Sequence, residues 1–277
     1  MIKRENRVIE KYMAILDSKH IITTSPTTYN LKLIECGSYI QVYCYDNKKK
    51  RKQKDNSDLN LKNVCTTQED NEKKEIKKIE ERSIIRSKLE CQRLAKSNME
   101  HWETFITLTF KDNIKDVDIA NKQFRYFVDK IKRVKKDFMY LCVPEFQKRG
   151  AVHYHLLTNI SLDSKLIYSQ ENNEKYKHIK YWNEGFDRVD KITGDVKKIV
   201  GYISKYMTKD IDNRLFGHRR YFYSRNLKRP RENYINLDNE REYDFYKEKI
   251  QGKQLIFQKD YQNLYDNSKV TFFEYLK

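Results

Sequence analysis

The residues of this sequence that could do chemistry are two tyrosines and two histidines. Tyr202 and Tyr206 are four residues apart, and His153 and His155 are two apart in a strand-like run at 152–157. A phenol becomes a nucleophile when a cation stabilises its charge, and imidazoles are common metal ligands. Together these residue types could cut a phosphodiester through a covalent tyrosine intermediate.

Residues 196–209 have the pattern of an amphipathic helix that would position the tyrosines. Residues i, i+3, i+4 and i+7 of a helix share a face, so one stripe contains Tyr202, Lys205, Tyr206 and Lys209. The apolar residues form a separate stripe, Val196, Val200, Ile203 and Met207, which is the expected core face. The tyrosine stripe should therefore face solvent or a substrate. A phenol ionises near pH 10, so we expect Lys205 or Lys209 to stabilise the phenolate or the charge that develops on phosphorus.

The two histidines should share one face of a strand, because side chains alternate along it. A three-residue hairpin loop at 148–150, with Gly150 at positive φ, would pair Gln147 with Ala151. In this register Glu145 lies opposite His153 and supplies a third ligand. Nitrogen and carboxylate donors suit Mg²⁺ or Mn²⁺ with open positions for phosphate, and zinc is disfavoured because no cysteine is at ligand spacing.

Two alternatives bear on this site. A register that differs by one residue would turn Glu145 to the other face of the hairpin. Taken alone, the histidine pair could also be incidental to a half-buried strand.

The elements around these residues predict an α+β fold, an antiparallel sheet with helices on one face in a ferredoxin- or RRM-like arrangement. The other face would stay free for a substrate. The pattern predicts strands at 105–110, 138–143, 151–159 and 185–192, and helices at 117–133 and 196–209. Four segments follow: an N-terminal β-hairpin accessory segment at 1–66, a charged helical linker at 67–100, a catalytic domain at 101–230 and an aromatic and basic C-terminal extension at 231–277.

Composition points to nucleic acid and to the interior of a cell. The 277 residues include 57 Lys and Arg against 40 Asp and Glu, a formal charge of +17, with 21 Tyr and 13 Phe among them. Cations neutralise phosphates and rings stack on bases, single strands included, although a lysine-rich genome would give a similar bias. The five cysteines form no CxxC pair and no secretion signal or membrane-length apolar run is present, so we expect a reduced, cytoplasmic protein without membrane contact.

Three segments resemble the motifs of a known family. FITLTF at 105–110, PEFQKRGAVHYHLL at 144–157 and GYISKYMTKD at 201–210 are similar in order and spacing to motifs one to three of rolling-circle replication initiators, which are HUH endonucleases. The two-tyrosine form and the WNEGF segment at 182–186 resemble the phage-type replication proteins. The resemblance covers about residues 100–230.

The resemblance implies roles for named residues. His153 and His155 would bind the metal, with Glu145 as a third ligand whose position varies in the family. Tyr202 and Tyr206 would be nucleophiles and Lys205 their assistant, although single-tyrosine relatives would use the counterpart of Tyr202 alone. We expect DNA contacts from the basic residues on and after the helix, Lys209, Arg219, Arg220, Arg225, Lys228 and Arg229.

The implied activity is the nicking of single-stranded origin DNA of a plasmid or phage in a bacterial cell. The protein would stay linked to the 5′ end and leave a 3′-hydroxyl primer for a host DNA polymerase. A host helicase would unwind the duplex, because the sequence has no Walker-type phosphate loop.

Two alternatives remain open. A tyrosine HUH transposase would use the same site on the ends of a mobile element. A basic RRM-like binding module would make no use of Tyr202 or the histidines and predicts base-stacking aromatic residues on the sheet face.

Overall fold

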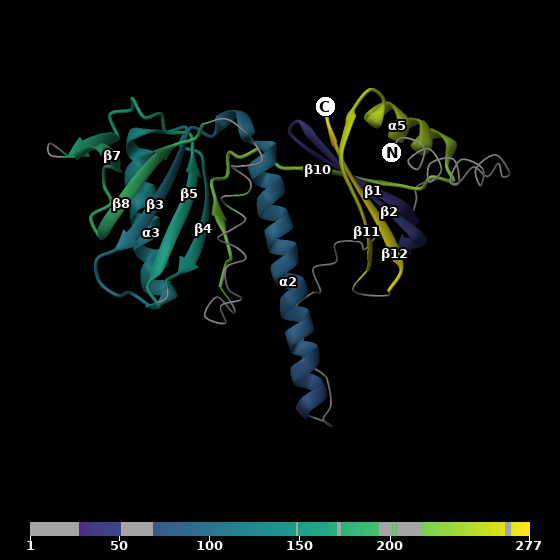
Figure 1. Cartoon of the computed structure of the whole chain (residues 1–277), viewed down its shortest axis with the longest axis horizontal. Coiled ribbons are helices and arrows are strands. Elements are labelled where there is room, and N and C mark those ends of the chain that lie inside the picture. The colour runs from purple at the N-terminus through teal and green to yellow at the C-terminus, as the bar shows by residue number, and fades with distance from the viewer. Residues whose placement is uncertain are drawn as a thin grey trace. The chain divides into compact units, whose positions relative to one another are not determined.

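The computed structural model describes residues 28–50, 69–147, 149–170, 173–193, 201, 203, 218–263 and 267–277. For 69–80, 170 and 173–175 it describes the backbone alone. The chain divides into two compact units, residues 69–229 and residues 1–68 with 230–277, and each is described by itself (Figure 1). No helix in the described ranges is long and apolar enough to cross a membrane.

The unit that carries the histidines is built on a seven-stranded antiparallel sheet. Its strands in spatial order are β6 (Ile167–Gln170), β7 (Asn173–Ile179), β8 (Gly185–Lys191), β3 (Thr104–Phe110), β5 (Val152–Thr158), β4 (Tyr140–Phe146) and β9 (Phe222–Tyr223). Strand β5, which bears both histidines, therefore lies between β3 and β4. The sheet confirms the antiparallel α+β class.

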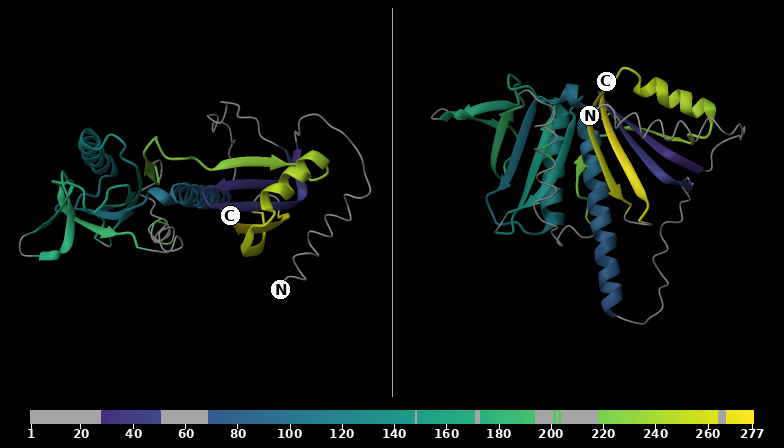
Figure 2. Two further views of the ribbon diagram at one scale, coloured as in Figure 1. Left: turned by 90° about the horizontal axis from the view of Figure 1, so that it is seen from above. Right: turned by 45° about the vertical axis from the view of Figure 1, so that its right-hand side comes forward.

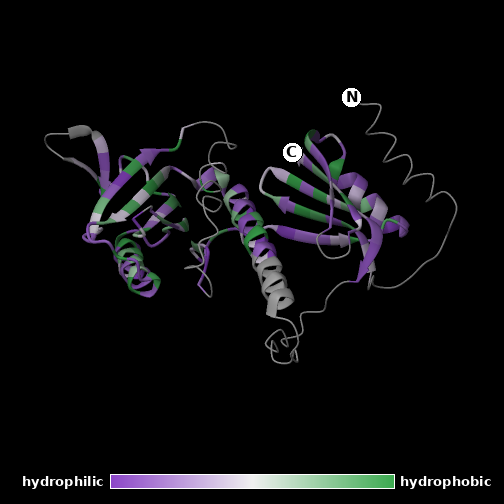
Figure 3. Cartoon of the chain, turned by 60° about the horizontal axis from the view of Figure 1, so that its bottom comes forward, coloured by the Kyte–Doolittle hydropathy of each residue, from purple (hydrophilic) through white to green (hydrophobic). Residues whose placement is uncertain are grey.

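Helix α3 (Val117–Val134) covers one face of this sheet (Figure 2). It begins at Asp116, whose carboxylate accepts hydrogen bonds from the backbone N–H groups of Asp118 and Ile119, a standard N-cap. Hydrophobic and hydrophilic residues alternate around the helix (Figure 3). Its apolar side packs on every second residue of the central strands, in a core that includes Phe124, Phe127, Ile131, Ile106, Leu108, Tyr154 and Leu156.

The opposite face, which the sequence predicts to be free, is partly covered. The last turns of helix α2 (Glu69–Ser97) bury Cys91, Leu94 and Ala95 in a second cluster that includes Trp102, Phe105, Leu141 and Leu157. A short helix, η1 (Met99–His101), follows. The reason is chemical: the few apolar residues of this charged helix gather near its C-terminal end, and they need a partner surface. The prediction of a free face is wrong at this end of the sheet.

Asn98 fixes the end of α2 to a distant segment. Its side-chain N–H donates to the carbonyls of Leu94 and Lys228, each at 2.9 Å, and its Oδ1 accepts from the N–H of Lys228 at 2.8 Å. Asn98 is fully buried, so these bonds satisfy polar groups that water cannot reach. The end of the predicted linker is thus part of the histidine-bearing unit.

The second unit joins both ends of the chain in one sheet. Its order is β10 (Arg231–Ile235), β1 (Thr28–Cys36), β2 (Tyr39–Lys50), β12 (Lys269–Leu276) and β11 (Gln254–Gln262), with helix α5 (Glu240–Ile250). The expected hairpin turns at Gly37, whose φ is 59°. From sequence, 1–66 and 231–277 are predicted as separate segments, whereas Leu31 of β1 pairs with Ile235 of β10.

Candidate metal centre and nucleic-acid interface

The hairpin of β4 and β5 has the predicted register. The N–H of Gln147 donates to the carbonyl of Ala151 at 2.9 Å, and the N–H of Gly150 donates to the carbonyl of Gln147 at 2.7 Å. Gly150 has a φ of 93°, which a residue with a side chain rarely adopts. Glu145 is consequently the direct cross-strand partner of His153. Register is therefore fixed by the turn, and the carboxylate lies on the histidine face.

Two rows of residues cross four strands on this face. The first runs from β8 to β4 through Phe186, Thr109, His153 and Glu145. The second, two residues along, contains Arg188, Thr107, His155 and Val143. Alternate residues of β3 and β5, such as Leu108 and Tyr154, face α3 instead. The histidines therefore lie on the side of the sheet away from α3.

His155 is held from three sides. Its Nε2 is 2.7 Å from Oε2 of Glu145, in an ion pair whose side chains are 5 % and 13 % exposed. Its Nδ1 is 3.3 Å from the hydroxyl of Thr107, and its ring stacks on Phe105 with 5.9 Å between centroids. Partners at both ring nitrogens and on the ring face fix the orientation of the imidazole.

His153 has an unused nitrogen. Its Nδ1 is 3.4 Å from the hydroxyl of Thr109, whereas its Nε2 is buried without a hydrogen-bond partner in the described structure. Burial, followed by the nearby His155, lowers the pKa of His153 to about 4. At neutral pH the ring is therefore uncharged, the form in which imidazole binds metal ions.

The donor types match the predicted metal site, although the described residues hold no preformed group of three metal-binding side chains. The histidine ring centroids are 6.5 Å apart, and Glu145 is bound to His155 directly. Without a cation, a buried carboxylate is satisfied by the nearest donor. The unpartnered Nε2 of His153 and the carboxylate of Glu145 are the kinds of donor that Mg²⁺ or Mn²⁺ accepts.

The predicted nucleophile helix is only partly described. Tyr202, Lys205, Tyr206 and Lys209 lie outside the described residues, but Gly201 and Ile203 are helical. Ile203 is fully buried in the cluster of Phe105, Leu141, Val143 and Leu157, as the predicted apolar stripe requires. The residue that follows Tyr202 therefore packs on the histidine face.

The basic residues after the nucleophile helix flank β9, the edge strand beside β4. Arg219 and Arg225 are exposed and Arg220 is half-buried. Lys228 forms a 2.6 Å ion pair with Glu100. Arg229 donates to the hydroxyl of Tyr223 at 2.9 Å and lies over its ring at 5.3 Å. Their contact with DNA stays a prediction.

Sequence reasoning missed three residues of the histidine face, Thr107, Thr109 and Phe186. The signal was present, because Thr107 and Thr109 alternate with the apolar residues of FITLTF and so belong to the face opposite the core. Phe186 had no such signal, since it is apolar and would be assigned to a core.

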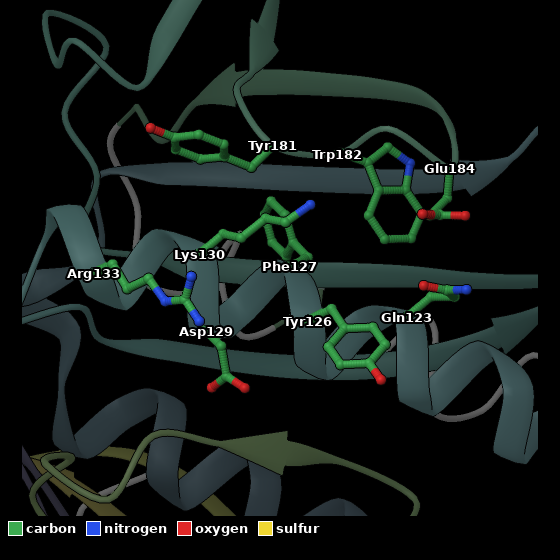
Figure 4. A pocket seen from close by; sticks show the side chains of 9 residues that line it. All are labelled: Gln123, Tyr126, Phe127, Asp129, Lys130, Arg133, Tyr181, Trp182 and Glu184. Carbon is green, nitrogen blue, oxygen red and sulfur yellow. The ribbon is translucent and has the colours of Figure 1, made fainter.

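A cavity of about 380 Å³ lies on the other side of the sheet, between α3 and the loop before β8 (Figure 4). It is lined by Tyr126, Lys130, Arg133, Tyr181, Trp182 and others. Trp182 and Phe127 belong to the α3 core, so the cavity is separated from the histidines by the sheet.

Comparisons with known proteins give two matches. Residues 103–211 match a family model for replication-associated proteins of the ORF2 type. The chain is 30 % identical over 144 residues to the phasyl DNA replicon protein arp of Escherichia coli, an alignment that covers 45 % of this chain and 50 % of the relative. The chain thus spans half the length of this curated relative. No solved structure matches the chain.

Proposed function

We propose that this chain is a replication initiator that nicks single-stranded origin DNA through a tyrosine nucleophile. Support comes from the replication-associated family model, whose match contains both histidines and both tyrosines, and from the similarity to a replicon protein. The observation that carries the proposal is a shared face: Glu145, the histidine pair and Ile203, the neighbour of Tyr202, all lie on the side of the sheet away from α3.

In the proposed reaction the phenol oxygen of Tyr202 attacks the scissile phosphorus, and the bond from phosphorus to the 3′ oxygen breaks. The phenol loses a proton and the 3′ oxygen gains one, so the products are a 5′-phosphotyrosine and a 3′-hydroxyl primer. Lys205 stabilises the charge that develops. Tyr206 accepts the next strand, which allows the first to be rejoined without ATP.

His153, His155 and Glu145 are the residues proposed to hold Mg²⁺ or Mn²⁺. A divalent cation bound there would polarise the scissile phosphate. The protein's own contribution is to prepare the ligands: burial keeps His153 neutral, and the hydroxyls of Thr107 and Thr109 orient the two rings. Such supporting partners are a regular part of metal sites.

The finer fold and partners follow from this proposal. The order β8-β3-β5-β4, in which β5 is inserted between β3 and β4, is that of a split βαβ unit and supports a ferredoxin-like HUH endonuclease fold. We propose origin DNA, a host helicase and a host DNA polymerase as partners, in the cytoplasm of a bacterial cell.

The test is covalent capture. The full-length protein is incubated with Mn²⁺ and single-stranded fragments of the replicon that encodes it, and adducts are resolved on a denaturing gel. We expect an adduct that EDTA and the double substitution Tyr202→Phe, Tyr206→Phe abolish, and that the control Tyr181→Phe, on the cavity side of the sheet, retains. An adduct that survives the double substitution, or none with any fragment, would refute the proposal. The single substitutions identify which phenol reacts first.

A non-catalytic binding module is the second candidate, favoured by the exposed Phe186 on the sheet face. It predicts single-strand binding that is indifferent to Tyr202 and to EDTA. The same gel separates the two candidates, because a binding module forms no covalent adduct. A transposase would form one, and would prefer the terminal hairpins of a mobile element over origin DNA.

A further inference from the structure

Phe186 is the most exposed large hydrophobic side chain of the described residues, at 73 %. It belongs to β8, a strand whose neighbour Val189 is buried in the α3 core. Side chains alternate along a strand, so Phe186 projects from the opposite face. A folded protein gains nothing in stability from a phenyl ring left in water, which makes its position informative.

The ring lies in the same cross-strand row as the metal-ligand candidates. Phe186 pairs with Thr109, and Thr109 pairs with His153. Adjacent strands are about 4.8 Å apart, so the backbones of Phe186 and His153 are about 10 Å apart. A planar group that stacks on Phe186 would therefore lie next to the histidine pair.

A cation accompanies the ring on the same face. Arg188 is two residues along β8, with its guanidinium 5.4 Å from the centre of the Tyr176 ring and 2.8 Å from the carboxylate of Asp190. Both Arg188 and Tyr176 are exposed. We call Phe186, Arg188 and Tyr176 the β8 surface.

We propose that the β8 surface binds single-stranded DNA, with one base stacked on Phe186, and so positions the adjoining phosphate for the histidine site. Exposed rings combined with cations are how proteins bind single strands. Duplex bases are already stacked and cannot use the ring. A protein partner fits poorly, because the apolar ring has charged Arg188 and Asp190 beside it rather than a continuous apolar patch. The proposal deepens the proposed function, on which the identity of the bound strand depends.

The test separates stacking from charge. Affinity for a fluorescein-labelled oligothymidylate and for an abasic oligonucleotide of equal length is measured by fluorescence anisotropy over a range of salt. We expect Phe186→Ala to weaken oligothymidylate binding by between about 5-fold and 100-fold, to leave abasic binding unchanged and to leave the salt dependence unchanged, since no phosphate contact is lost.

Controls distinguish a ring from mere bulk. Phe186→Trp should keep the affinity and Phe186→Leu should lose it, because leucine is apolar but cannot stack. Phe257→Ala removes another exposed phenylalanine, 49 % exposed on β11, and should have little effect. Thermal unfolding should be the same for all variants of the exposed Phe186. Unchanged affinity in Phe186→Ala, or equal losses in the Phe186→Ala and Phe257→Ala proteins, would overturn the inference.

Covalent capture keeps this inference apart from the proposed function. With Phe186→Ala the DNA concentration for half-maximal adduct should rise, while the rate at saturating DNA changes little. A wild-type protein that binds oligothymidylate through Phe186 and forms no adduct would refute the nicking function alone. A Phe186→Ala protein with normal binding and normal adduct would refute the stacking role alone.

Discussion

The carboxylate of Glu145 lies 2.7 Å from Nε2 of His155, although its direct cross-strand partner is His153. The contact is diagonal, between residues offset by two positions, a distance that long side chains can bridge on one sheet face. His155 is thereby satisfied, whereas Nε2 of His153 is buried without a partner in the described structure. Glu145 thus orders one imidazole and leaves a donor on the other.

Replacing Glu145 should weaken metal binding more than it weakens the fold. Glu145→Gln keeps the shape of the side chain and removes its charge. We expect Mn²⁺ affinity to fall at least about tenfold, because even the loss of a partner that only supports a ligand costs about 10- to 100-fold. Isothermal titration calorimetry on the wild-type and variant proteins measures the change.

A matched control is available on β8. Asp187 also lies near a histidine, 3.5 Å from Nδ1 of His178, and accepts a hydrogen bond from the N–H of Ile179, which asparagine could still do. Asp187→Asn should leave Mn²⁺ affinity unchanged. Equal affinities for wild type and Glu145→Gln would remove Glu145 from the ligand set.

Gly185 should not tolerate a side chain. A Cβ atom there would overlap the backbone N–H of Lys111 and the carbonyl of Thr109, and backbone cannot move aside as a side-chain tip can. We expect Gly185→Ala to lower the free energy of unfolding by at least about 1–3 kcal/mol, measured by urea denaturation. Gly201→Ala is the control: its Cβ would meet nothing within 4 Å, and alanine in a helix is about 1 kcal/mol more favourable than glycine. If Gly185→Ala were as stable as Gly201→Ala, the close approach of β8 to β3 would be wrong.

The sequence predicted the parts of the site that depend on local rules. Gly150 marked the turn, the turn set the register, and the register placed Glu145 opposite His153. Helical spacing likewise assigned Ile203 to the apolar stripe, where the structure buries it. Each of these inferences spans only a few residues, over which backbone geometry is nearly decisive.

Long-range pairing could not be predicted in the same way. Nothing local indicates that Leu31 pairs with Ile235, since any alternating strand could be the partner. The hairpin of β6 and β7 was missed because its strands are polar and β7 has a single pairing with β8, Lys177 to Val189. The cover over the histidine face was missed because Cys91 and Leu94 are isolated among charges.

Glu35 should make the stability of the unit with both chain ends depend on pH. Burial raises its pKa, but hydrogen bonds and ion pairs with Lys277 and Lys249 outweigh burial and lower the pKa below its usual 4.5. A carboxyl group with a depressed folded pKa stabilises the protein above its unfolded pKa, and the stabilisation is lost as the pH falls through the folded pKa. Glu35→Gln should therefore cost about 1 kcal/mol at neutral pH and nothing in acid.

Urea denaturation at a series of pH values checks this window. Glu248→Gln, at an exposed position of α5, should follow the wild type at every pH. A deficit in Glu35→Gln that persisted below the folded pKa would mean that packing, and not the ion pairs, stabilises this site.

Ile203 provides the link between the nucleophile segment and the histidine face, and its truncation should damage both stability and chemistry. The side chain is fully buried among Phe105, Leu141 and Leu157, so Ile203→Ala should leave a cavity and cost about 2–5 kcal/mol in the free energy of unfolding. Ile119→Ala makes the same truncation at a position 51 % exposed on α3 and should cost about 0.5 kcal/mol or less. Under conditions where both variants stay folded, adduct formation at saturating DNA should be slower in Ile203→Ala alone, because Tyr202 precedes it in the chain. Similar small costs for both variants would show that Ile203 is not packed on the sheet, and would remove the observation that ties the tyrosines to His153 and His155.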